Sequence, residues 1–211
     1  MADAVVLAGG FSTRFGEDDK ATAKLDGDPL ISHVVDSVSD VETVETVIIN
    51  TRPRQTSEIR SCLGLGSRDG SVEIEFAEDD EPGLGPVGGV LTGMEKAESE
   101  YAAVVACDMP LLSPDLFEYL LGESRRLEAD AAVPRLDGWL QTTHAVYRRS
   151  ATLEACETSL TQSTTDTQTS MRRTLEDLDY ISVDEDEVLK HASQESFVNV
   201  NTRSDLERIR D

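Results

Sequence analysis

A segment that could bind phosphate groups runs from Leu7 to Lys20. It reads Leu-Ala-Gly-Gly-Phe-Ser-Thr-Arg-Phe-Gly and then Glu-Asp-Asp-Lys, and it follows a run of apolar residues. Gly9 and Gly10 have no side chain, so the backbone can approach a ligand closely and direct N–H groups at phosphate oxygens. Arg14 and Lys20 can add positive charge. The spacing fits neither a Walker A loop nor a dinucleotide-binding fingerprint. The alternative is an ordinary turn in which the glycines only relieve strain.

An acidic residue, Asp108, comes directly after the most hydrophobic run of the chain, in Ala-Cys-Asp-Met-Pro. A carboxylate at the end of a buried strand can hold Mg²⁺, which takes one or two carboxylates together with substrate phosphates. Alternatively, Asp108 only caps a turn before Pro110. A phosphate-binding segment elsewhere in the chain favours the metal-binding interpretation.

A second glycine-containing motif covers residues 83–89, Gly-Leu-Gly-Pro-Val-Gly-Gly. Its backbone could pass closely across a nucleobase or ribose, or it could form a tight loop and allow close helix packing. Asp79 and Asp80 precede it, and either could reach a ligand.

A pair of asparagines, Asn199 and Asn201, lies near the C-terminus in Phe-Val-Asn-Val-Asn-Thr. Residues two apart point to the same side of an extended segment, so their amides could together bind a polar group. Taken alone, this pattern is weak.

Nucleophilic catalysis and a clustered metal site are not indicated. The three histidines are scattered, and none stands near a serine or cysteine in a recognisable nucleophile motif. The three cysteines are widely spaced and are expected to be reduced, structural thiols, namely Cys62, Cys107 and Cys156.

The elements that would position these residues alternate between strands and helices. Nearly continuous apolar runs rich in Val and Ile are typical of strands buried on both faces. Such runs are Ala4–Ala8, Val44–Ile49, Val72–Ala77 and Tyr101–Cys107. Segments with helical spacing separate them, which predicts a three-layer, Rossmann-like α/β fold with a mostly parallel twisted sheet. Ligands of such sheets bind at the carboxyl ends of the strands, where the motifs above fall.

The second half of the chain continues the pattern. We expect helices at Pro114–Leu127, Met171–Leu178 and Ser204–Arg210, and strands at Ala131–Pro134, Thr143–Tyr147 and Tyr180–Val183. Residues 162–170, rich in Ser, Thr and Gln, are expected to form a surface loop. An acidic turn and the apolar run Phe197–Val200 would precede the last helix.

The charge is strongly unbalanced. The 42 acidic and 19 basic residues give a formal net charge of −23. A surface this negative would repel nucleic acid, which is therefore not an expected partner. It favours a cytoplasm rich in salt, where charges are screened within ~3 Å at 1 M. No run approaches the ~20 apolar residues of a membrane span, so we expect a cytoplasmic protein without membrane contact.

Taken in order, the motifs resemble those of the molybdenum cofactor guanylyltransferases, the MobA family of nucleotidyltransferases. The matching patterns are L-A-G-G-x-S-x-R-x-G…D-K, G-P-V-G-G, C-D-M-P and F-V-N-V-N-T. Residues 138–147 also resemble a family segment, although Thr142 stands where a proline is usual. The Ser/Thr-rich stretch at 162–170 is a second departure, and both lie towards the pterin side.

The resemblance implies a single nucleotidyltransferase domain over 1–211, with a nucleotide-binding half (1–112) and an acceptor-binding half (113–211). It implies nucleotide contacts from Leu7, Ala8, Gly9, Gly10, Asn50, Asp79 and Gly85. Lys20 and Arg14 would lie at the phosphates, and Asp108 would bind Mg²⁺. Asn199 and Asn201 would face molybdopterin.

The implied substrates are GTP and molybdopterin, with transfer of GMP and release of pyrophosphate. The resemblance also implies transient contacts with molybdenum cofactor biosynthesis proteins or with recipient molybdoenzymes. One alternative keeps the chemistry with another nucleotide, such as CTP, or with a sugar-phosphate or cofactor-phosphate acceptor. The other is a non-catalytic nucleotide-binding module, against which the joint presence of Arg14, Lys20 and Asp108 argues.

Overall fold

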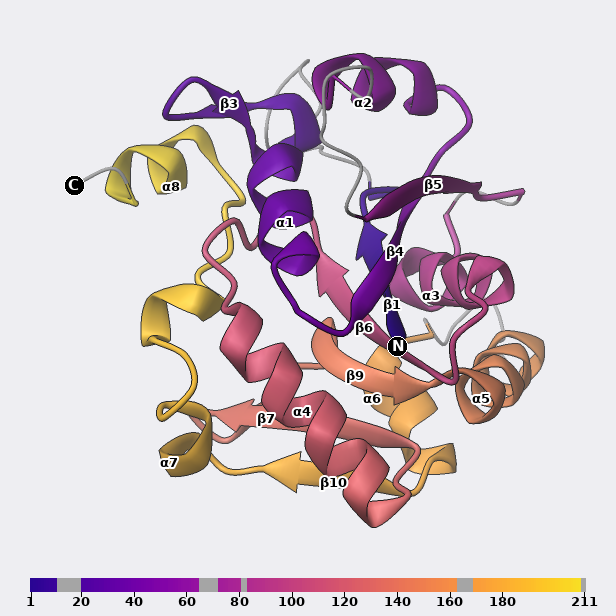
Figure 1. Cartoon of the computed structure of the whole chain (residues 1–211). Helices are drawn as coiled ribbons and strands as arrows, with labels where there is room; N and C mark the ends of the chain where they lie inside the picture. Colours follow the sequence, from indigo (N-terminus) through magenta and orange to yellow (C-terminus); the bar gives the residue numbers. More distant parts are fainter. Residues whose placement is uncertain (11–19, 65–71, 81–82, 163–168, 210–211) are drawn as a thin grey trace.

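The computed structural model describes residues 1–10, 20–64, 72–80, 83–162 and 169–209. One mixed sheet runs through the molecule in the order β10-β7-β9-β6-β1-β4-β5 (Figure 1). In chain order these strands are β1 (Ala2–Leu7), β4 (Val44–Thr51), β5 (Glu73–Glu78), β6 (Tyr101–Ala106), β7 (Ala131–Leu136), β9 (His144–Arg148) and β10 (Tyr180–Val183). Neighbouring strands are parallel except at β9, which is antiparallel to both β6 and β7.

Smaller pairings lie beside the main sheet. The short strand β8 (Trp139–Leu140) pairs with the end of β7 in a hairpin. A separate two-stranded hairpin joins β2 (Lys24–Leu25) to β3 (Asp28–Pro29). The β7–β8 hairpin is followed by β9, and the β2–β3 hairpin is followed by α1 (Leu30–Ser39).

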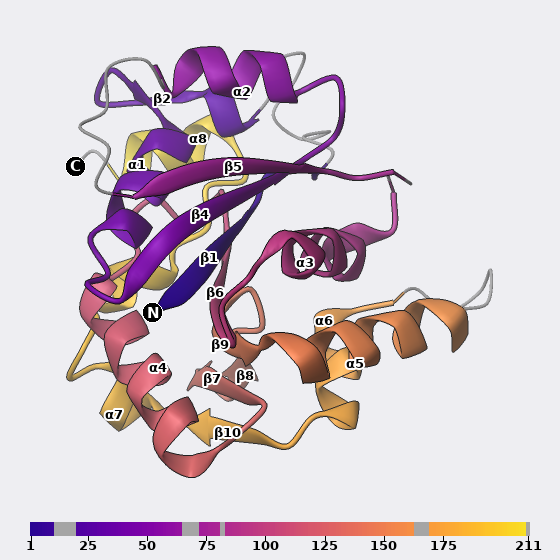
Figure 2. The same ribbon diagram turned by 45° about the vertical axis from the view of Figure 1, so that its right-hand side comes forward.

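Helices cover both faces of the sheet, as Figures 1 and 2 show. One face carries α1 (Leu30–Ser39), α2 (Thr56–Cys62), α4 (Pro114–Leu127) and α7 (Glu185–Val188), and the other carries α3 (Gly85–Lys96), α5 (Arg149–Gln162) and α6 (Met171–Thr174). The side chains of β1 alternate between the two cores: Ala4 and Val6 belong to the first, Val5 to the second. This is the predicted three-layer α/β arrangement.

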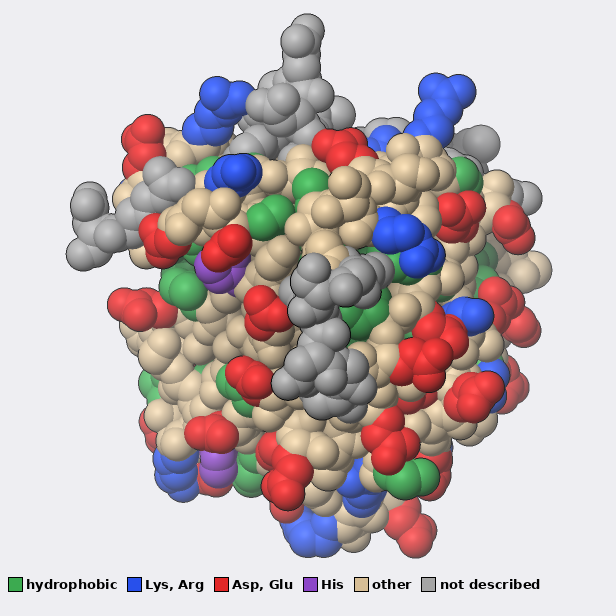
Figure 3. All heavy atoms as spheres, turned by 45° about the horizontal axis from the view of Figure 1, so that its top comes forward, with side chains coloured by type: hydrophobic (Ala, Val, Ile, Leu, Met, Phe, Trp, Pro, Cys, Tyr) green, Lys and Arg blue, Asp and Glu red, His purple; other side chains and the backbone are tan. Residues whose placement is uncertain are grey.

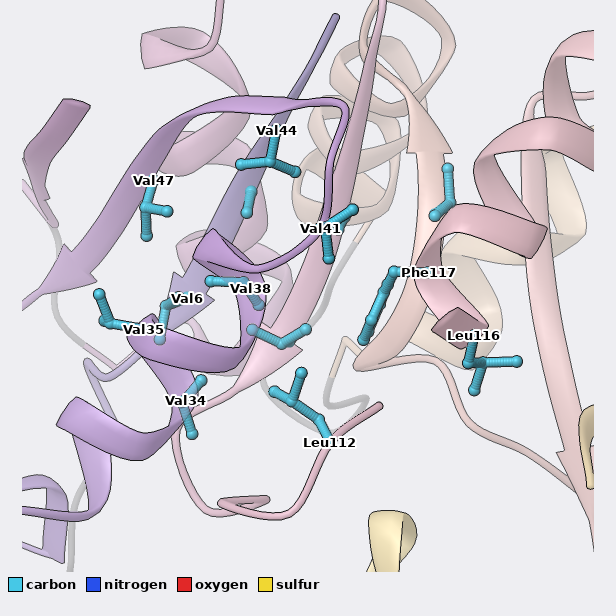
Figure 4. Packing of buried hydrophobic residues seen from close by; sticks show 14 of the residues in the cluster. Val6, Val34, Val35, Val38, Val41, Val44, Val47, Leu112, Leu116 and Phe117 are labelled. Atoms are coloured by element: carbon cyan, nitrogen blue, oxygen red, sulfur yellow. The ribbon is translucent and has the colours of Figure 1, made fainter. Parts of the chain in front are cut away.

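Helix α1 shows why these residues form these elements. Its side chains Val34, Val35 and Val38 recur at helical spacing, are buried, and point towards Val6 and Val47 on the sheet (Figure 4). A helix with this apolar stripe has to pack on the sheet to remove the stripe from water.

Most predicted elements are present, and several ends differ. The helix Pro114–Leu127 and the strand Tyr180–Val183 have the predicted bounds. The expected helix Met171–Leu178 is a short α-helix followed by a 3₁₀ turn at Leu175–Asp177, and the expected acidic turn is α7. Residues 194–197 form a further 3₁₀ turn, and α8 (Arg203–Arg208) ends the described chain. Most of the expected loop, 163–168, lies outside the described residues.

Helix α5 was not predicted from the sequence. The residues that it buries are small or polar: Thr152, Ala155, Cys156 and Ser159. They recur at helical spacing, but a helix is recognised in a sequence by large apolar side chains at that spacing, and these residues are not large and apolar. Helix α5 packs against α3, which also carries glycines. No helix in the described part of the chain is long and apolar enough to cross a membrane.

Close packing of α3 on β1 leads to a first prediction. A Cβ added at Gly93 would lie 2.3 Å from Cγ1 of Val5, which is buried. Gly93→Ala is therefore expected to lower the free energy of unfolding by about 1–3 kcal/mol, as overpacked cores do. Gly122→Ala is the matched control. Gly122 lies on the exposed side of α4, where a Cβ would meet no described atom within 4 Å, and the substitution is expected to raise stability by about 0.5–1 kcal/mol. Urea unfolding measures both, and equal stabilities would contradict this account.

Candidate active site

The predicted functional residues lie at the carboxyl edge of the parallel strands. Leu7, the last residue of β1, pairs with Asn50 on β4 and with Ala106 on β6. Asp79 comes directly after β5, and Asp108 follows β6 by two residues. The sheet therefore brings together polar side chains from motifs that are distant in the sequence.

Three side chains from distant parts of the sequence meet at one point. The Lys20 ammonium donates to Asp108 Oδ2 at 2.7 Å and to Asn201 Oδ1 at 2.8 Å. The side chains of Lys20 and Asp108 are 14% and 19% exposed, so solvent only partly screens their attraction. The backbone N–H of Val200 also donates to the Asp108 carbonyl oxygen, at 2.8 Å. The end of the glycine-containing segment, the acidic motif and the C-terminal motif thus form one cluster.

The second carboxylate oxygen of Asp108 has a different environment. Oδ1 is buried and has no hydrogen-bond partner among the described residues. Leaving a buried carboxylate oxygen unpaired costs free energy, and such an atom suits a ligand that completes the site. The described residues contain no group of three or more His, Cys, Asp or Glu that could hold a metal ion.

A second polar cluster lies on the other side of β1. Asn50, which is 2% exposed, donates to Asp79 Oδ1 at 2.6 Å. A Cβ on Gly9 would lie 2.8 Å from Asp79 Oδ2, and one on Gly89 would lie 2.5 Å from Asn50 Oδ1. Asp79 and Asn50 therefore approach these two glycines too closely for any side chain at either position. Asp79, not the exposed Asp80, makes the contact with Asn50.

The remaining predicted residues are placed as follows. Gly85 begins α3 with φ +67°, a conformation that favours glycine. A Cβ on Gly10 would meet no atom within 4 Å among the described residues. The exposed Asn199 turns its amide towards the Phe197 carbonyl oxygen at 3.4 Å, so only Asn201 of the pair reaches Lys20. Arg14 lies outside the described residues.

Gln55 is a site residue that the sequence did not suggest. It is buried, and its Nε2 donates to the Ala8 carbonyl oxygen at 3.4 Å. Its Oε1 accepts from the Arg52 Nε at 2.9 Å. The Gln55 side chain thereby supports the backbone just before Gly9. A lone glutamine after a strand carries no recognisable motif.

His144 is a second residue without a sequence motif. Its buried ring lies between Phe117, at a centroid distance of 4.8 Å, and Phe197, at 4.6 Å. Its Nδ1 is 3.2 Å from Met109 Sδ, and Met109 adjoins Asp108. The imidazole therefore packs between the two segments that carry Asp108 and Asn201.

Burial determines the protonation of His144 and leads to a prediction. Removal from water lowers the pKa of the imidazole from 6.5 to about 3. The unfolded chain therefore takes up a proton below pH 6.5 that the folded chain does not. The stabilisation from the neutral ring is complete above pH 6.5 and is lost as the pH falls towards 3. In His144→Phe, the fall in unfolding free energy with decreasing pH is expected to be shallower than in the wild type. Denaturant unfolding at several pH values measures the two slopes, and identical slopes would refute this assignment.

The model of the MobA-like NTP transferase domain family matches residues 4–180. The chain belongs to this family. A relative from Natronomonas pharaonis, named "Probable molybdenum cofactor guanylyltransferase", is 39% identical over 207 residues, which cover 98% of this chain and 96% of the relative. A relative of the same name from Haloferax mediterranei is 31% identical over 205 residues, which cover 97% and 91%.

A solved structure agrees with the membership in the MobA-like family. Molybdopterin-guanine dinucleotide biosynthesis protein A from Archaeoglobus fulgidus superposes with a TM-score of 0.75 at 26% identity, over 98% of this chain and 95% of that one. The fold class and the nucleotidyltransferase family expected from the motifs are thus confirmed. The chain is a nucleotidyltransferase.

Proposed function

We propose that this enzyme transfers GMP from GTP to the terminal phosphate of molybdopterin and releases pyrophosphate. The observation that carries the proposal is the cluster of Lys20, Asp108 and Asn201, because it joins three of the family motifs at the carboxyl edge of the sheet. The names of the relatives support the same substrates.

The reaction needs little covalent chemistry from the protein. A terminal phosphate oxygen of molybdopterin attacks the α-phosphorus of GTP in line. The new P–O bond forms as the bond to the β-phosphate oxygen breaks, and its electron pair leaves with pyrophosphate. A phosphate monoester is already charged near neutral pH, so no side chain has to remove a proton. The protein contributes positioning and neutralisation of charge.

The nucleotide would lie along β1 and the start of α3. In this proposal the backbone of Leu7, Ala8, Gly9 and Gly10 approaches GTP, and Gly85 lets the loop before α3 approach it. Beside Gly9, the Asn50 side chain donates to Asp79 Oδ1 at 2.6 Å, so the two side chains hold each other in place. In this proposal they bind polar groups of the nucleotide. Lys20 and Arg14 would neutralise the triphosphate.

Asp108 is the residue proposed to hold Mg²⁺. Its buried Oδ1, which lacks a partner among the described residues, fits a hard cation that takes one carboxylate and several phosphate oxygens. When bound, the ion would neutralise charge on the phosphates. Lys20 keeps the carboxylate in place through Oδ2. Asn201 holds the Lys20 ammonium from the other side and, with Asn199, would face the acceptor.

The proposed setting is a cytoplasm rich in salt, in which recipient molybdoenzymes or other molybdenum cofactor proteins make transient contacts. The formal net charge of −23 supports this setting. Nucleic acid and membranes are not part of the proposal.

One panel of assays tests the substrates. Pyrophosphate release is measured in high salt with Mg²⁺ and each of GTP, CTP, UTP and ATP, with and without molybdopterin. We expect release only with GTP and molybdopterin together, and molybdopterin guanine dinucleotide as the product. Release with CTP would assign a different nucleotide. GTP binding without any pyrophosphate release would indicate a non-catalytic module.

A further inference from the structure

Trp139, the only tryptophan of the chain, stands exposed on a tight hairpin. The residue is 65% exposed, which is unusual for so large an aromatic residue. The turn before it is formed by Asp137 and Gly138, with φ values of 49° and 79°. Two consecutive positive φ values are typical of the turns that join strands tightly. Trp139 then pairs with Leu136 on β7, so the hairpin fixes the backbone that carries the indole.

The strand register puts this hairpin at the level of the proposed active site. Ala103 on β6 pairs with Val146 on β9, and Val146 pairs with Ala132 on β7. Four residues after Ala103 comes Cys107, directly behind the end of β6, and four residues after Ala132 comes Leu136, the partner of Trp139. In the order of the sheet, only β9 separates β7 from β6. Trp139 therefore lies at the same edge of the sheet as Asp108, towards the acceptor half.

A cation accompanies the exposed ring. The Arg172 guanidinium of α6 lies over the indole, 5.7 Å from the ring centroid. Figure 2 shows α6 next to the β7–β8 hairpin. The backbone is also held in place, because Gln141 Nε2 donates to the Trp139 carbonyl oxygen at 3.3 Å, and the Asp137 N–H donates to Glu185 at 3.1 Å. Arg172 leaves most of the indole accessible, so a planar ligand could stack on it.

We propose that Trp139 and Arg172 bind the pterin ring of molybdopterin. This inference rests on the proposed function and extends it, because it assigns a place to the end of the acceptor that does not react. The terminal phosphate and the pterin are at opposite ends of molybdopterin. With the phosphate at Lys20 and Asp108, a second contact at a distance is needed to orient the molecule. An indole offers a planar heteroaromatic ring a stacking surface, and the guanidinium adds positive charge near the anionic dithiolene.

Because Trp139 is the sole tryptophan, its fluorescence reports on this place alone. Molybdopterin added to the wild-type protein in high salt is expected to quench the emission in a saturable manner. N-acetyltryptophanamide in the same solution corrects for light that the ligand absorbs. GTP alone and inorganic phosphate alone are expected to leave the corrected emission unchanged. Quenching by GTP alone would assign the ring to the nucleobase and overturn the proposal.

Steady-state kinetics gives a second test. Trp139→Ala removes the surface on which the ring would stack, so it is expected to raise the KM for molybdopterin about 10-fold. The KM for GTP should stay within about two-fold, and Trp139→Phe should recover most of the loss. Arg172→Gln is expected to raise the KM for molybdopterin by a smaller factor. Arg173→Gln is the matched control, since it removes the same charge from the same helix and should change neither KM.

The outcomes separate this inference from the proposed function. Suppose that the wild type transfers GMP, that molybdopterin does not quench its emission, and that Trp139→Ala has the wild-type KM for molybdopterin. The pterin site is then refuted and the reaction stands. If the wild type does not transfer GMP, the proposed function fails. The fluorescence titration with molybdopterin can still be made in that case, and emission that molybdopterin leaves unchanged would refute the site.

Discussion

Lys20→Ala and Asp108→Asn are each expected to lower the rate of GMP transfer by at least ~10²-fold while the fold stays intact. A preorganised charge next to reacting phosphates contributes most of its stabilisation in the transition state, and losses of 10²–10³-fold are usual when one such group is removed. The two side chains are 2.7 Å apart and largely shielded from water, so each substitution removes a charge that solvent screens only partly. Pyrophosphate release under saturating GTP and molybdopterin measures the effect.

Controls for this prediction come from the same residue types elsewhere. Lys96→Ala removes an ammonium whose partner, Glu75, lies 3.0 Å away on the sheet face, and Asp115→Asn changes an exposed carboxylate at the start of α4. Both variants should keep close to wild-type activity. The circular dichroism spectrum of each variant should match that of the wild type. Near-normal turnover by either site variant would refute the assignment of the active site.

The double variant tests whether the two residues act as one unit. Because Lys20 holds Oδ2 of Asp108, removal of either partner disturbs the other. The combined variant should therefore lose little more activity than one single variant. Additive losses would mean that Lys20 and Asp108 contribute independently, with no role for their contact.

Low salt is expected to unfold the protein. The net charge is −23, and lowering the ionic strength from 1 M to 0.01 M lengthens the screening distance from ~3 Å to ~30 Å, which is comparable to the size of the domain. Acidic side chains are spread over the face in Figure 3, with basic ones among them, so the repulsion acts over a wide surface. The unfolded chain relieves this repulsion by expanding. Thermal unfolding followed by circular dichroism should show a Tm that falls steeply as KCl is removed.

A neutral solute separates screening from other effects of salt. Sucrose strengthens burial by exclusion from the protein surface, but it does not screen charge. Sucrose added at low salt should therefore recover only part of the lost Tm. Recovery equal to that with KCl would indicate surface exclusion as the cause, and a Tm independent of KCl would refute salt adaptation.

The sheet could be predicted largely from the sequence. Continuous apolar runs such as Tyr101–Ala106 need cover on both faces, and this requirement alone implies helices on two sides. The start of α4 was predictable because Pro114 suits a first helical turn and cannot continue a strand ladder. Helix α5 was missed because its buried side is built from small residues, including Ala155 and Ser159, that show no contrast in hydropathy.

The site could be predicted only in part. Lys20, Asp108 and Asn201 were each suggested by a motif, but the sequence did not indicate that Asn201, 181 residues from Lys20, would accept from its ammonium. Gln55 and His144 could not be assigned to the site from the sequence, because the role of a single polar residue depends on its surroundings in the fold. His144 is kept neutral by two aromatic rings from distant segments.

By itself, then, the sequence determined the alternation of strands and helices, the motifs at the strand ends and the acidic surface. These properties depend on neighbouring residues and on composition. The tertiary structure alone decided which motif side chains touch and that the hairpin with Trp139 lies at the same edge of the sheet as the site. It also decided that one Asp108 oxygen is held by Lys20 while the other has no partner in the described part of the chain. The physical reason is that such contacts join residues distant in sequence, and the register and packing of the whole sheet determine their distances.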